Sequence, residues 1–139
     1  MSYVLRADIA SRIPPAFIVE ALDDDSDGIE DTGLWDQICA TIDSEIDGFL
    51  SRRYTLPLSD PPASLRSGAS SLMCEALYQR RGIASDSNPH TAAAGRFRAW
   101  LQDIATGKSA LQVSQSPARA PISIISEPAG TVPRRRLNG

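Results

Sequence analysis

The segment Asp23-Asp24-Asp25-Ser26-Asp27-Gly28 has the residue types and spacing that open a calcium-binding loop. In such a loop, carboxylates at alternate positions converge on the cation, and a glycine at position six permits the sharp turn. The pattern then fails, because position twelve is Leu34, where a bidentate glutamate is needed, and position eight is Glu30, where an apolar residue is usual. The sequence therefore favours a solvated acidic loop without a metal, and leaves a calcium-responsive interaction module as an alternative.

Nucleophilic catalysis has weak support. The run Gly68-Ala69-Ser70-Ser71 lacks the second glycine of a nucleophile elbow, and His90 is the only histidine. His90 stands near an expected helix start, which is typical of a surface or capping residue. Neither a phosphate-binding loop nor a dinucleotide fingerprint occurs. Cys39 and Cys74 lie among apolar residues without a CxxC pair, which predicts reduced, buried thiols. We therefore expect neither an enzyme nor a cofactor.

Basic and apolar residues in two places are candidates for contacts with other protein chains. Arg52 and Arg53 suit the negative end of a helix, with Tyr54 over the edge of the core, and the same residues suit an intersubunit contact. Arg134 to Arg136 either solubilise the chain end or pair with carboxylates of a partner. The predicted protein–protein residues are Arg52, Arg53, Tyr54, Ile122, Ile124, Ile125, Arg134, Arg135 and Arg136.

The charge is unevenly distributed. The chain carries a net charge of −3, yet no lysine or arginine occurs between Ile13 and Ser51, a stretch that holds eleven acidic residues. Such a segment repels phosphate and argues against a surface that grips DNA. The alternative from that class is a small helical DNA-binding regulator with its turn and recognition helix around 82–93. Its flanking cations would be Arg80, Arg81, Arg96 and Arg98.

Apolar periodicity and helix-ending residues predict an all-α fold, a small bundle of four to five helices. The clearest stripe has steps of three and four residues, which match the helical period; it comprises Trp35, Ile38, Ile42, Ile46 and Phe49. We expect helices at 5–12 and 15–22, a long one capped by Thr32, one capped by Asp60 and ended by Gly82, and one capped by Asn88 and ended by Gly107.

The composition changes after Ala110. Prolines at 117, 121, 128 and 133 break any helix, and residues 122–125 are able to form a short strand. We therefore divide the chain into a helical body, residues 1–110, and an extended, proline-rich, basic arm, residues 111–139. Alone, the arm buries too little apolar surface to offset the entropy lost on ordering, so we expect it to dock on a partner.

From Tyr3 to about residue 105, the organisation resembles the Mu-type neck protein family of tailed phages. Tyr3-Val4 precedes a short helix with Asp8-Ile9, and the long helix carries Ile42-Asp43 and Ile46-Asp47-Gly48-Phe49-Leu50. That helix ends in Ser51-Arg52-Arg53-Tyr54, followed by Leu56-Pro57-Leu58 and Pro61-Pro62. The run from Ile46 to Leu58 before a proline-started helix is the most specific part of the resemblance.

The resemblance implies a structural head-to-tail connector in the neck of the virion, assembled in the host cytoplasm. Related connectors form rings of about twelve copies between the portal protein and the next neck or tail-completion protein. Phage DNA would pass through the lumen without sequence-specific binding. No apolar stretch approaches the roughly 18 residues of a membrane span, and the first residues lack the apolar run of a secretory signal, so we expect no membrane partner.

Overall fold

The computed structural model describes residues 2–112, which form five helices and no β-strand. The all-α fold is thus confirmed for this part of the chain. No described helix is both long enough and apolar enough to cross a bilayer. The helices are α1 (Arg6–Ala10), α2 (Pro15–Ala21), α3 (Leu34–Leu50), α4 (Ala63–Arg80) and α5 (Thr91–Thr106).

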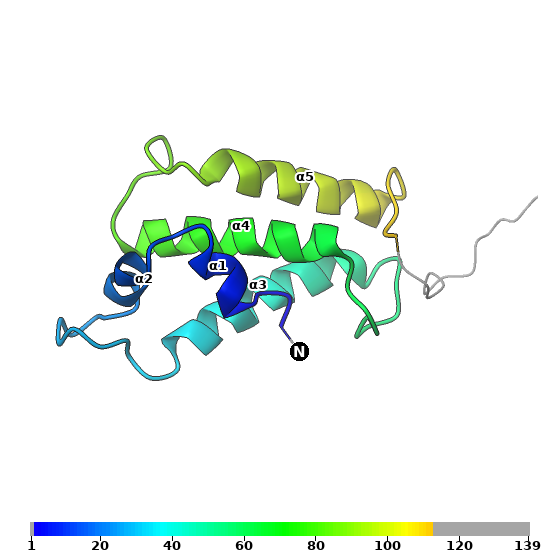
Figure 1. Ribbon diagram of the computed structural model, residues 1–139. Helices are drawn as coiled ribbons and strands as arrows, with labels where there is room; N and C mark the ends of the chain where they lie inside the picture. The colour runs from blue at the N-terminus through cyan, green and yellow to red at the C-terminus, as the bar shows by residue number, and fades with distance from the viewer. Residues whose placement is uncertain (1, 113–139) are drawn as a thin grey trace, which may run out of the picture.

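Helix α4 is the centre of the molecule. It contacts each of the other four helices: α3 and α5 run alongside it, and the short α1 and α2 pack against its remaining side (Figure 1). Burial therefore extends around most of α4 and includes Ser70, Ser71 and Glu75. The hydroxyls of Ser70 and Ser71 donate to the carbonyl oxygens of Arg66 and Ser67, so their burial leaves no unmet hydrogen bond.

Helix α3 packs against both α4 and α5, as its apolar stripe predicted. Four apolar residues of α3 are buried: Cys39, Ile42, Ile46 and Leu50. Trp35, Ile38 and Phe49 are half-buried at the margins of this buried stripe.

Gly68 allows a close approach of a side chain from α5. The ring of Phe97 occupies the position that a Cβ on Gly68 would take. A Cβ built on Gly68 would overlap that ring, far inside van der Waals contact. Phe97 is 7% exposed, so the ring has little room to move away.

The helix starts differ from the predicted ones. Gly33, Pro62 and His90 are the N-cap residues of α3, α4 and α5, in place of Thr32, Asp60 and Asn88, and none of the three makes a side-chain capping hydrogen bond. Asn88 instead organises the preceding turn: its amide oxygen accepts from the His90 N–H at 2.9 Å, and its Nδ2 donates to the Glu75 carbonyl at 3.2 Å.

The predicted helix ends are confirmed, because Gly82 and Gly107 adopt the left-handed conformation just past α4 and α5, with φ of +79° and +89°. Glycine takes this conformation without the steric cost that a Cβ imposes. Leu111, which the sequence analysis assigned to the arm, is 7% exposed and packs with the core of the body. The rest of the predicted arm, with residues 122–125 and 134–136, lies outside the described residues.

Candidate interaction surfaces

The end of α3 holds three of the predicted contact residues, and their side chains take different directions. Arg52 is exposed. Arg53 lies against Gly107 at the end of α5, in the space that a Cβ at that position would fill. Tyr54 is 6% exposed, and its hydroxyl oxygen accepts the Leu111 N–H at 2.8 Å. Tyr54 therefore joins the end of α3 to the segment after α5, and its contact with another subunit stays a prediction.

Ile122, Ile124, Ile125, Arg134, Arg135 and Arg136, the remaining predicted contact residues, lie outside the described part of the chain.

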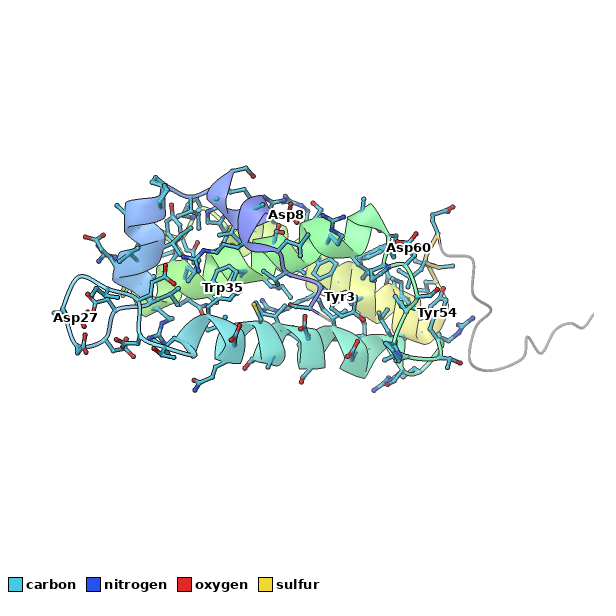
Figure 2. All side chains as sticks on the ribbon, turned by 60° about the horizontal axis from the view of Figure 1, so that its bottom comes forward. Tyr3, Asp8, Asp27, Trp35, Tyr54 and Asp60 are labelled. Atoms are coloured by element: carbon cyan, nitrogen blue, oxygen red, sulfur yellow. The ribbon has the colours of Figure 1, made fainter. Side chains whose placement is uncertain are left out.

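The N-terminal segment makes a polar tie to α3 that sequence reasoning missed. The Tyr3 N–H donates to Asp43 Oδ1 at 3.0 Å, and the Tyr3 hydroxyl donates to Asp47 Oδ1 at 2.6 Å. Ser2 Oγ donates to the same oxygen of Asp43 at 3.2 Å. Burial, followed by the hydrogen bond and negative charge of Asp47, raises the pKa of Tyr3 well above its usual range. The resemblance motifs around residues 3, 43 and 47 thus meet in space, and Figure 2 shows Tyr3 of the N-terminal segment beside α3.

Tyr3→Phe should lower the free energy of unfolding by about 1–2 kcal/mol, because it keeps the buried ring and removes the donor to the Asp47 carboxylate. Urea titration followed by circular dichroism measures the change. Tyr78→Phe is the matched control, since the Tyr78 hydroxyl makes no hydrogen bond within the described residues and its ring is likewise packed against the core.

The Tyr3 hydroxyl should also make the stability of the original chain depend on alkaline pH. Because the folded pKa of Tyr3 is raised, the unfolded chain loses this proton first, and stability should fall as the pH rises above the ordinary tyrosine value of about 10. That component should be absent from Tyr3→Phe and present in Tyr78→Phe. Identical alkaline slopes in all three proteins would show that the Tyr3–Asp47 contact contributes nothing.

The acidic loop between α2 and α3 brings four carboxylates together. Oxygens of Asp23, Asp25, Asp27 and Asp31 lie within 4.8 Å of one another. Asp23 accepts the N–H groups of Asp27 and Gly28, and Asp27 accepts that of Ile29. These bonds to the loop's own backbone explain the convergence as a turn held by aspartates.

Two features of this loop bear on calcium. Leu34 begins α3 and has no side-chain oxygen to offer at position twelve, and Glu30 pairs with Arg6. The side-chain hydrogen bond with Asp23 raises the pKa of Asp25, and the charges of Asp27 and Asp31 add to the effect. The loop is thus a region of strong negative potential, and metal binding there stays untested.

We expect calcium at about 1 mM to leave the melting temperature of the protein unchanged, since the bidentate ligand that closes such loops is absent. Differential scanning fluorimetry, with and without the cation, measures it. The double variant Asp25→Asn/Asp27→Asn is the control. A rise in melting temperature for the original chain, with none for the variant, would establish a calcium site.

The arginines of the alternative DNA-binding reading are mostly engaged within the molecule. Arg80 pairs with Asp24 at 2.5 Å, and Arg81 with Glu20 at 3.4 Å. Arg98 bonds Glu45 at 2.7 Å and the buried Glu75 at 3.0 Å, which ties α3, α4 and α5 together. Figure 1 shows α4 and α5 side by side, whereas a helix-turn-helix crosses its helices steeply. Of the four, only Arg96 has no carboxylate partner within residues 2–112.

The residues considered for nucleophilic catalysis each make separate contacts and do not form one site. Ser70 and Ser71 donate to backbone carbonyls inside α4. His90 packs edge-on against Tyr78, with ring centroids 4.8 Å apart, and burial lowers its pKa. Cys39 and Cys74 are buried free thiols, and burial raises the pKa of both. The described residues therefore assemble no Ser-His-Asp arrangement.

Comparison with known proteins gives one family match. The model of a family described as Bacteriophage Mu, Gp36 matches residues 3–123, which is most of the chain. The match includes Tyr3 and its partners on α3, all five helices of the described residues and the first part of the predicted arm. No curated protein matches the chain significantly.

Proposed function

The chain belongs to the family of Bacteriophage Mu Gp36, and from this premise we propose that it is a structural head-to-tail connector. In this proposal it forms a ring between the portal protein and the next neck or tail-completion protein, with DNA passing through the lumen. Membership in the family makes it a phage protein; the connector role, the ring of about twelve copies and the location in the neck are proposed.

The observation that carries the proposal is the family match across residues 3–123, because it covers the same motifs as the resemblance to neck proteins. The body also suits assembly with other chains. It is a bundle packed around one central helix, and its described residues carry an acidic surplus that would not retain passing DNA.

A connector binds other proteins through exposed groups that have no partner within its own chain. Arg52 offers an exposed cation at one end of the bundle, and Arg96 offers one along α5. Neither has a carboxylate partner in the described part of the chain. We propose that such groups, together with the arm, meet carboxylates of neighbouring subunits or of the portal.

The DNA-binding regulator is disfavoured by the ion pairs of Arg80, Arg81 and Arg98, which leave few cations for phosphates. A gel shift at low salt separates the two functions, because phosphate contacts give a steep dependence on salt.

Inactivating the gene in the phage tests the connector function. The lysate should contain DNA-filled heads and complete free tails that remain unjoined, counted by negative-stain electron microscopy. Joined particles at the normal frequency, or an early block in head formation, would contradict the proposal.

A further inference from the structure

An open cleft of about 270 Å³ lies between α1 and α4. Its walls carry two guanidinium groups, Arg12 just after α1 and Arg66 on α4, with hydroxyls between them. One carboxylate, that of Asp8, also lines it and reaches Arg66 at 3.5 Å. The cleft therefore holds more positive than negative charge on an otherwise acidic molecule.

Arg12 is the uncompensated cation. Its guanidinium donates to the neutral hydroxyls of Ser71 at 3.2 Å and Ser67 at 3.3 Å, and it has no carboxylate partner within the described residues. Its field reaches other groups: after burial, its charge is the next cause that lowers the pKa of His90. Two serines fix the guanidinium at the cleft without neutralising it, so an external carboxylate would find a pre-positioned partner.

The acidic loop of the same chain has the complementary properties. The carboxylates of Asp23, Asp25, Asp27 and Asp31 converge and take part in no ion pair within the described residues. Beside them projects Ile29, which is 67% exposed. The loop thus combines uncompensated negative charge with one apolar side chain in water.

An apolar partner for Ile29 lies next to the cleft. A smaller groove of about 150 Å³ shares Arg66 with it and has Leu5 on its wall, with Asp60 also lining it. Leu5 is 44% exposed, and Leu5 and Ile29 are the exposed large apolar residues of the described part of the chain. The cleft and groove together offer the guanidinium of Arg12, which has no carboxylate partner in the described residues, and the apolar side chain of Leu5, beside Arg66, Asp8 and Asp60. The loop offers carboxylates and an apolar side chain.

Within one molecule the loop does not reach the cleft. The ion pairs Arg80–Asp24 and Arg6–Glu30 hold it beside α2 and α3. Figure 2 shows Asp27 at one extremity of the molecule and Asp8, which lines the cleft, near its middle. No residue of the acidic loop lines the cleft or the groove.

We propose that the acidic loop, residues 23–31, of one copy seats in the Arg12–Arg66 cleft of the next copy, with Ile29 against Leu5. The two surfaces differ, so the contact is heterologous and repeats from copy to copy until a ring closes. The inference rests on the proposed ring and names the contact that joins its subunits.

Charge reversal tests the contact in the full-length chain. Arg12→Glu/Arg66→Glu reverses the cleft, and Asp25→Lys/Asp27→Lys reverses the loop. Sedimentation velocity at low salt should show oligomers for the original chain and at least a tenfold weaker association for each variant, with the original oligomers weakening as salt is raised. Lys108→Glu/Gln102→Glu/Ala99→Glu changes the net charge equally at exposed positions away from the cleft, and it should assemble normally.

Mixing the two reversed variants should restore the oligomers, because each reversed surface then meets a complementary one on the other variant.

Ile29→Ser supplies a second test that leaves the fold intact, since that side chain is exposed. It should weaken association at an unchanged melting temperature. The inference is overturned if the original chain stays monomeric up to its solubility limit, if the reversed variants assemble as the control does, or if mixing restores nothing. The connector function would survive those results, because it is tested separately by the joining of heads to tails.

Discussion

Gly68→Ala should destabilise the protein by about 2–3 kcal/mol, although the same change in an open helix stabilises. The new Cβ would enter the Phe97 ring, and the ring is enclosed by the core. Either α4 and α5 separate or the ring leaves its rotamer, and both costs exceed the gain in helix propensity. Urea titration followed by circular dichroism measures the difference.

Gly95→Ala is the matched control, because Gly95 lies within α5 with nothing near its Cβ position. It should stabilise the protein by about 0.5–1 kcal/mol. Combining Gly68→Ala with Phe97→Leu should return part of the loss, since the smaller side chain vacates the overlap. Equal effects of Gly68→Ala and Gly95→Ala would contradict the close packing of α4 on α5.

Ile42→Ala should lower the free energy of unfolding by roughly 2–5 kcal/mol, because it opens a cavity where α3 meets α4 and α5. Ile38→Ala removes the same atoms from a half-buried position one turn away, so its loss should be clearly smaller. Denaturant melts of the two variants compare them directly. Equal losses, or a loss below about 0.5 kcal/mol for Ile42→Ala, would show that the buried stripe of α3 lies elsewhere.

The sequence predicts α3 and α5 well because each buries one side, so that apolar spacing carries the signal. Helix α4 is different. It packs on four neighbours, and Ser70, Ser71 and Glu75 occupy buried positions that a one-sided pattern assigns to solvent. Their hydrogen bonds and ion pairs, which make this burial tolerable, cannot be read from spacing.

The sequence did not predict the hydrogen bonds of the N-terminal segment, because they join residues that are distant along the chain. Tyr3 meets Asp43 and Asp47 across some forty residues, and no local pattern links them. The predicted N-caps differ from the observed ones because α3, α4 and α5 begin at Gly33, Pro62 and His90 without a side-chain cap. Asn88, a stronger capping residue, forms the turn before α5 instead.

The unequal roles of the arginines also depend on the fold. In sequence, Arg12, Arg80 and Arg98 are equivalent cations, yet Arg80 and Arg98 are each paired with carboxylates, whereas Arg12 has no carboxylate partner within residues 2–112 and donates to Ser67 and Ser71. Whether a cation has a carboxylate partner thus depends on contacts between residues that are distant in sequence.

The most direct measurement of the central claim is in vitro complementation of tail joining. Heads from the phage that lacks this protein are mixed with free tails and the purified chain, and joined particles are counted by electron microscopy. Full-length chain should restore joining, whereas a chain that ends at residue 112 should melt like the original, since it retains every described core residue, and should fail to join heads to tails. Failure of the full-length chain to restore joining would contradict the connector function.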